Sequence, residues 1–341
     1  CHHRIQTFLM PSTKKSDTSG VVGLMVSQIR AWMALKNSFA VLNARECFDI
    51  VYVPTVDWIA KSIEILGSPF GKVPFVALYM SPKHHIHASG LGPKSRQDWL
   101  YDKLFKRFLG IPTLQRLLTI DEVFFEFCSK RYPKSEEKII FAPDFGEVKG
   151  SVFYEECRRA LGVAEDKYVI LVYGSLTSRK GIMELIYALG CLRESDNIVL
   201  VLAGRPDAEI NDFIQTQLGQ GLIEEGRLIP RLFFHQSEQE CCVFKAADVV
   251  WVAYSEGFYG SSGVLHQALS VRKPVISKSI GLIGRLVKNH QLGWIVDYET
   301  TEELVDKLKD IAVKSKGKKV PDLSLEGFSE QYSPRAHVRA V

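Results

Sequence analysis

Two loops in the second half of the sequence combine glycine, hydroxyl groups and positive charge as a phosphate site requires. The segment YVILVYGSLTSRKGIMELIYAL reads as a buried strand, a turn at Gly174 and a helix, and the turn carries Ser175, Arg179 and Lys180. Glycine permits backbone angles that other residues avoid, and a helix N-terminus favours an anion, more so beside a lysine. The loop predicts a phosphate or diphosphate site. The alternative is an ordinary strand-to-helix loop with a solvated basic pair.

A second loop of small residues follows another predicted strand, in DVVWVAYSEGFYGSSGVLHQALSVRKPVI. Backbone N–H groups at Ser261, Ser262 and Gly263 could face an anion or a sugar, whereas in the simpler alternative a serine only caps the helix. Because parallel strands share one carboxyl edge, we expect both loops to meet at one crevice.

The elements that position these loops alternate between apolar β-rich runs and helical patterns, which is typical of parallel sheets with crossover helices. In the first part we predict strands over residues 49–53, 73–79, 116–120 and 138–141, and helices over residues 22–40, 58–66 and 98–109. In the second part the predicted strands are residues 168–173, 198–203, 232–234, 249–253, 274–276 and 293–296. The predicted helices there are residues 183–192, 208–218, 238–246, 262–269 and 301–312. The fold class is therefore α/β, with two Rossmann-like doubly wound domains.

The length of 341 residues exceeds one ordinary core, so two domains are expected. Proline and glycine between residues 142 and 152 mark a boundary. We assign residues 1–145 to an N-terminal domain, residues 146–325 to a nucleotide-binding domain, and residues 326–341 to a tail that could return to the first domain. Only residues 4–10 could form an opening strand, and the chain begins with Cys1, so we expect the first domain to be truncated at its start.

Composition narrows the class of protein. Apolar residues at 46% and charged residues at 24% fit a globular chain, and no apolar run reaches the ~20 residues of a membrane-spanning helix. The net charge of +4 is dispersed, so we expect no nucleic-acid partner. The 7 cysteines lack CxxC or metal-ligand spacing, which favours reduced thiols in a cytoplasmic protein and no metal.

Residues 150–300 resemble the nucleotide-binding half of retaining glycosyltransferases of family GT4, which have the GT-B fold. The cues are EECRRALG, the Gly174 segment, VLVLAGRPD, RLFFHQSEQECCVFKAADVVWVAYSEGF, SSGVLHQALSVRKPVI and GLIGRLV. The resemblance implies that the two domains face a cleft, and it implies a metal-independent enzyme of the hexosyltransferase type without a cofactor. It would move a sugar from a nucleotide-diphosphate sugar, with a UDP-sugar favoured, to an acceptor such as a glycan or lipid-linked sugar. The acceptor would bind on the side of the first domain.

The resemblance also assigns the diphosphate contacts. Family members usually place an arginine just after the first strand's glycine and a lysine just before the helix glycine. Lys180 matches the lysine, and we expect it to be catalytic because its charge stabilises the leaving diphosphate. Ser175 stands at the arginine position, and Arg179 could replace the missing charge.

Two glutamates eight positions apart usually hold the donor sugar and the ribose in this family. Tyr259 and Gln267 stand at these positions here. Glu256, three residues before Tyr259, serves as the first glutamate if the loop carries an insertion; otherwise the pair is lost. Gln267 can still hydrogen-bond ribose hydroxyls.

Four further features are weaker candidates. Arg205 follows a strand and could contact phosphate or pair with Asp207, and His235 stands in the loop that usually reads the base. In the HHIH stretch, His84 could hold a proton for the leaving group, or be a loop residue without a chemical role. The basic, amphipathic residues 98–109 could contact a membrane surface or pack on their own sheet; we favour packing.

Two rival interpretations remain open. Another GT-B enzyme, such as a nucleotide-sugar epimerase or a phosphorylase, would use the same fold. A non-catalytic GT-B subunit that binds a nucleotide sugar or a partner transferase would explain the altered glutamate pair. A dehydrogenase is disfavoured because no GxGxxG opens either domain.

Overall fold

The computed structural model describes residues 21–233, 236–255, 257–316, 328 and 330–340. It separates into two compact units: Cys1–Ser89 with Lys94–Ala142, and Gly90–Pro93 with Pro143–Val341. The main break therefore falls between Ala142 and Pro143, inside the predicted boundary region. The predicted opening strand at residues 4–10 lies outside the described residues.

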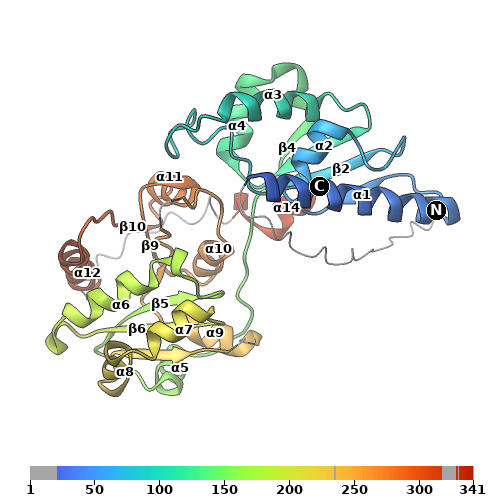
Figure 1. The fold of residues 1–341 in the computed structure, drawn as a ribbon. Coiled ribbons are helices and arrows are strands. Elements are labelled where there is room, and N and C mark those ends of the chain that lie inside the picture. Colours follow the sequence, from blue (N-terminus) through green and yellow to red (C-terminus); the bar gives the residue numbers. More distant parts are fainter. Residues whose placement is uncertain (1–20, 234–235, 256, 317–327, 329, 341) are drawn as a thin grey trace. The chain divides into compact units, whose positions relative to one another are not determined.

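The first unit is built on a parallel sheet in the order β1-β2-β3-β4 (Figure 1). Its strands are Val51–Val53, Phe75–Tyr79, Leu114–Thr119 and Ile139–Phe141. Its helices are α1 (Val21–Arg45), α2 (Ala60–Leu66), α3 (Asp98–Leu109) and α4 (Glu122–Arg131), with a 3-10 turn at Pro133–Lys138. The core is rich in aromatic side chains, among them Phe75, Phe105 and Phe124. Helix α4 was not predicted from the sequence; it begins where the Asp121 side chain accepts a hydrogen bond from the Phe124 N–H.

The second unit contains a six-stranded parallel sheet in the order β10-β9-β8-β5-β6-β7. Its strands are β5 (Tyr168–Tyr173), β6 (Ile198–Ala203), β7 (Leu228–Arg231), β8 (Val249–Trp251), β9 (Val275–Ser277) and β10 (Gly293–Ile295). The chain runs outward from β5 to one edge and then restarts at β8 on the other side. The predicted doubly wound α/β fold is confirmed, and the strand order reverses between β5 and β8, where such sheets bind ligands.

Helices cover both faces of this sheet (Figure 1). One face packs against α6 (Ile182–Cys191), α7 (Ala208–Ile214), α8 (Gln217–Glu224) and α12 (Thr301–Lys316). The other helices are α5 (Tyr154–Leu161), α9 (Ser237–Ala246), α10 (Gly263–Ser270), α11 (Gly281–Asn289) and α14 (Pro334–Ala340). The last of these is grouped with the second unit, and its His337 ring lies 2.9 Å from the Pro143 carbonyl oxygen. The predicted return of the tail to the first domain stays a prediction.

Some predicted elements were wrong or missing. The strand predicted over residues 232–234 is instead β7 at Leu228–Arg231, because an edge strand tolerates Pro230 while the apolar run after it forms a loop. The helix predicted over residues 208–218 is two helices, α7 and α8, and Thr216 caps the second of them. Helices α5 and α11 were not predicted.

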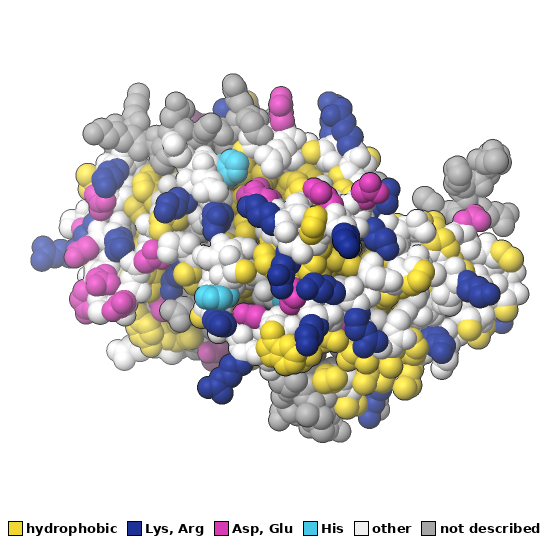
Figure 2. All heavy atoms as spheres, turned by 90° about the horizontal axis from the view of Figure 1, so that it is seen from above, with side chains coloured by type: hydrophobic (Ala, Val, Ile, Leu, Met, Phe, Trp, Pro, Cys, Tyr) yellow, Lys and Arg dark blue, Asp and Glu magenta, His cyan; other side chains and the backbone are white. Residues whose placement is uncertain are grey.

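On the face drawn in Figure 2, basic side chains lie among acidic and hydrophobic ones.

Candidate functional site

The loop between β5 and α6 is held in place by its neighbours on both sides. Leu176 pairs with the loop after β6, since its N–H donates to the Arg205 carbonyl (2.9 Å) and its carbonyl accepts from Asp207 (2.9 Å). Gly204 packs so closely on Gly174 that a Cβ there would lie 1.9 Å from the Gly174 carbonyl oxygen. On the other side, the Arg179 carbonyl accepts from the Ser255 N–H (2.7 Å). The backbone of the predicted phosphate loop is therefore preorganised.

Lys180 is the buried cation of this loop. It ends a 3-10 turn (Ser178–Lys180), and Gly181, in the left-handed conformation, leads into α6. Its ammonium group donates to the Tyr173 carbonyl at the end of β5, and its own carbonyl accepts from the Trp251 indole (2.7 Å). Burial, and secondarily the Arg179 charge, lowers the pKa of Lys180 from 10.5 to about 8. The lysine is mostly charged at neutral pH, and a nearby anion would favour that form.

The predicted second loop reaches the same place. A Cβ on Gly174 would lie 3.5 Å from Lys180 Nζ and 3.8 Å from Val264 Cγ2, in the first turn of α10. At the start of that helix, Gly263 is exposed and borders open space, since a Cβ there would meet nothing within 4 Å. Within the described part of the chain, the N–H groups of Gly263 and Val264 have no recorded acceptor. The two predicted helix openings therefore lie side by side.

The serines before α10 do not cap it with their side chains. Ser262 is buried, and its hydroxyl shares a hydrogen bond with the Tyr254 hydroxyl (3.0 Å). Ser261 donates to Asp144 (2.6 Å), which ties the loop to the segment entering this unit. Both hydroxyls are thus engaged, so any anion contact in this loop falls to the backbone.

Arg179 stays exposed at the rim of the loop. Its guanidinium carbon lies 5.2 Å from the centroid of the Phe258 ring and 6.0 Å from that of Tyr254. These two rings stack with centroids 4.3 Å apart. The arginine, like the exposed Ser175, is accessible to a ligand. Arg205 is also exposed, after β6, while the Asp207 carboxylate accepts a hydrogen bond from the Ile210 N–H.

Gln267 belongs to a small polar group that the sequence did not reveal. Its Nε2 donates to Glu240 Oε1 in α9 (2.7 Å), and the Tyr173 hydroxyl donates to the same oxygen (2.9 Å). Burial and this hydrogen bond raise the pKa of Tyr173, which keeps the hydroxyl protonated. Tyr173 and Glu240 were not predicted, because only the tertiary contact between α9 and α10 brings them together.

The remaining predicted residues of the second unit contribute less. Tyr259 acts through its backbone, since its carbonyl accepts from Leu282 at the start of α11 (3.0 Å). Glu256 and His235 lie outside the described residues. Their predicted roles stay predictions.

His84 lies in the first unit and is buried in the aromatic core. Its ring centroid is 4.7 Å from that of Phe105 and 5.3 Å from that of Phe124. Burial, and secondarily the neighbouring His85, lowers the pKa of His84 to about 3, so the ring is neutral at pH 7. These surroundings favour the packing role that the sequence left as the alternative to proton transfer.

Helix α3 divides its apolar side chains between two environments. Phe105, Phe108 and Leu109 are buried in the core, as the packing alternative predicted. Trp99, however, is 62% exposed, with Lys103 Nζ 4.8 Å from its ring centroid. None of the described helices has the length and apolar character to cross a membrane.

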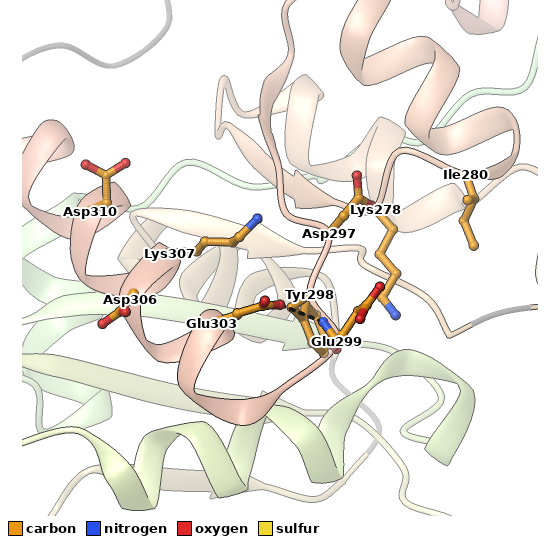
Figure 3. A pocket seen from close by; sticks show the side chains of 9 residues that line it. All are labelled: Lys278, Ile280, Asp297, Tyr298, Glu299, Glu303, Asp306, Lys307 and Asp310. Atoms are coloured by element: carbon orange, nitrogen blue, oxygen red, sulfur yellow. Dashed lines mark hydrogen bonds between the residues drawn. The ribbon is translucent and has the colours of Figure 1, made fainter.

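A pocket of about 680 Å³ lies beside α12 and the loop after β10. Figure 3 shows Lys307 and Glu303 extending from α12 toward it, near Lys278 and Tyr298. None of the predicted site residues lines it. Across the described ranges, no group of three or more His, Cys, Asp or Glu is arranged to hold a metal ion.

Comparison with known proteins gives matches in sequence and in fold. Residues 153–319 match the family model described as Glycosyl transferases group 1. An uncharacterized glycosyltransferase of Methanocaldococcus jannaschii is 30% identical over 140 residues, which cover 40% of this chain and 34% of that protein. The match therefore spans about a third of that relative's length.

Two solved structures share the whole fold. A glycosyltransferase from Rickettsia africae ESF-5 has a TM-score of 0.64 at 15% identity, covering 97% of this chain and 82% of that one. Anabaena Alr3699/HepE, solved in complex with UDP and glucose, has a TM-score of 0.62 at 15% identity, and the match covers 95% of this chain and 82% of that one. At these identities the likeness shows the GT-B fold alone.

Proposed function

We propose that this chain, whose residues 153–319 match the family model described as Glycosyl transferases group 1 and whose fold is GT-B, is a glycosyltransferase of the hexosyltransferase type. It transfers a sugar from a nucleotide-diphosphate sugar to a glycan or a lipid-linked acceptor. As in family GT4, which it resembles, the anomeric configuration is retained.

The observation that supports this proposal most is the convergence of two anion-binding devices at the carboxyl edge of the β5–β8 sheet. The Lys180 ammonium group and the side chain of Val264, in the first turn of α10, both lie within 4 Å of the Cβ position of Gly174. A lysine close to a helix N-terminus suits a diphosphate, which carries negative charge on both phosphates. In the proposed reaction these groups bind the donor and stabilise the charge that develops on the leaving nucleoside diphosphate.

The charge for this step comes from the protein, with Arg179 at the rim as a second cation. We therefore propose that the reaction needs no divalent metal. Uridine is the favoured base, and the Anabaena neighbour, whose structure holds UDP and glucose, supports that choice. We also propose that the protein is cytoplasmic and that the exposed Trp99 end of α3 contacts a membrane that carries the acceptor.

A binding screen followed by turnover tests the proposal. The protein is first screened by thermal shift with UDP, GDP and ADP. Hydrolysis of UDP-glucose, GDP-mannose and ADP-glucose is then measured without acceptor. We expect one diphosphate to raise Tm and its sugar to be hydrolysed slowly, with chelator having no effect. Lys180→Ala should lower turnover by about 10²–10³-fold.

Lys288→Ala is the matched control, because this lysine of α11 is exposed and distant from the β5–α6 loop in sequence. It should keep wild-type turnover. Binding without hydrolysis of any donor would favour the non-catalytic subunit instead, and the absence of binding to all three diphosphates would refute the proposal.

A further inference from the structure

Gln267 of α10 provides only an amide at its position. The contact between α9 and α10 places the carboxylate of Glu240 beside that amide. Glu240 Oε1 receives two hydrogen bonds, from Gln267 Nε2 (2.7 Å) and from the Tyr173 hydroxyl (2.9 Å). An ionised carboxylate only accepts hydrogen bonds, so the Gln267 amide must present its NH₂ to it. The group is half-buried, which leaves it open to solvent on one side.

Two acceptors of this group stay available. The described residues provide no recorded donor for Glu240 Oε2 or for Gln267 Oε1. Glu240 Oε2 is an oxygen of a carboxylate and has two lone pairs, so it can accept one hydrogen bond from each of two neighbouring hydroxyl groups of a ligand.

The group lies within reach of a nucleotide bound at the Lys180 loop. Tyr173 directly precedes Gly174, and its carbonyl accepts from Lys180. Gln267 stands four residues after Gly263 on α10, which is about one helical turn, or roughly 5.4 Å. In a nucleoside diphosphate the ribose is joined to the first phosphate through O5′ and C5′, so its 2′- and 3′-hydroxyls lie several ångströms from that phosphate, which is the scale of one helical turn.

We propose that Glu240, positioned by Tyr173 and Gln267, accepts hydrogen bonds from the 2′- and 3′-hydroxyls of the donor nucleotide's ribose. This inference rests on the proposed function and adds a specificity-determining residue to it. The negative charge is supplied by α9, and Gln267 of α10 holds it in place.

The test compares ribose with dideoxyribose in matched variants. Titration calorimetry measures the Kd of UDP and of 2′,3′-dideoxy-UDP, with GDP and ADP and their dideoxy forms as further probes. Wild type should prefer the ribose form by about 10- to 100-fold, the range for hydrogen bonds to a charged group. Glu240→Gln should lose most of this preference and leave the dideoxy form's Kd nearly unchanged.

Exchanging the two side chains provides the rescue. In the double variant Glu240→Gln/Gln267→Glu the carboxylate and the amide change places within the same pair, so the preference for ribose should return. Glu238→Gln, at an exposed position of α9, is the control and should behave as wild type.

The possible results distinguish a failure of this inference from a failure of the proposed function. A ribose preference that survives in Glu240→Gln would overturn the inference alone. Equal weakening of both nucleotides, with a lowered Tm and no rescue by the exchange, would show a structural role and overturn it as well. If wild type binds none of the three diphosphates, the proposed function fails and the inference fails with it.

Discussion

Raising the pH should weaken diphosphate binding because Lys180 loses its proton. Its pKa of about 8 means that roughly nine-tenths of the free protein carries this charge near pH 7, and roughly one-tenth near pH 9. A bound diphosphate raises the pKa of the lysine, so the complex keeps the proton over this range. The free protein must then take up a proton to bind, and the Kd should rise about tenfold between these two pH values.

Calorimetric titration of the preferred nucleoside diphosphate from about pH 7 to about pH 9 measures this change. Lys180→Met keeps most of the apolar stem but has no charge, so its Kd should start higher and lack the tenfold rise. Lys288→Met serves as the control for removing a surface charge. The ligand's own ionisation affects all three proteins equally and cancels in the ratio of wild type to variant. Equal pH slopes in wild type and Lys180→Met would refute the role given to this ammonium group.

Three further changes test other parts of the structure. Gly204→Ala should lower the free energy of unfolding by about 3 kcal/mol or more, because φ is 138° and the new Cβ would lie 1.9 Å from the Gly174 carbonyl oxygen. Gly221→Ala in α8, whose Cβ would meet nothing within 4 Å, should be neutral or stabilising in the same denaturant titration, and equal effects of the two would contradict this. At pH values between the ordinary pKa of 6.5 and the folded-state pKa of about 3, His84 is protonated only in the unfolded state. The free energy of unfolding of wild type therefore decreases as the pH falls through this range. His84→Leu should remove this decrease, so its free energy of unfolding relative to wild type should rise by about 2 kcal/mol between about pH 8 and about pH 5. A difference between the two proteins that does not change with pH would contradict the burial of this ring. Trp99→Ser should reduce flotation with anionic vesicles at low salt roughly tenfold, whereas wild-type protein that does not float would exclude the membrane contact.

The elements that the sequence predicted best are those whose signal is local. Strands β5 and β6 have the predicted bounds, since strands buried on both faces appear as unbroken apolar runs. The strand near residue 230 was misplaced because Pro230 is acceptable only at a sheet edge, and edge position is a tertiary property. Helix α11 was missed although it has a buried face, because GLIGRLV contains two glycines and is short.

The site was predictable as far as sheet topology determines it. Parallel strands bring their following loops to one edge, so the meeting of Gly174 and α10 followed from recognising β5 and β8. The pairing of Glu240 with Gln267 depends on how two helices pack and leaves no periodic pattern. The surroundings of His84 were likewise not predictable, since only the packing of α3 and α4 shows that this histidine after a strand lies in the core.

The β5–α6 loop is hydrogen-bonded to β8 through the Trp251 indole and to the loop after β6 through the backbone of Leu176. The Trp251 side chain is 2% exposed and touches the carbonyl of the lysine that we expect to meet the ligand. Its fluorescence is therefore a built-in reporter of occupancy, since charge placed on Lys180 changes the electric field at the indole. Because the chain has 5 tryptophans, a stopped-flow trace of a variant that keeps Trp251 and has phenylalanine in place of the others would follow ligand arrival in real time, without a label on either molecule.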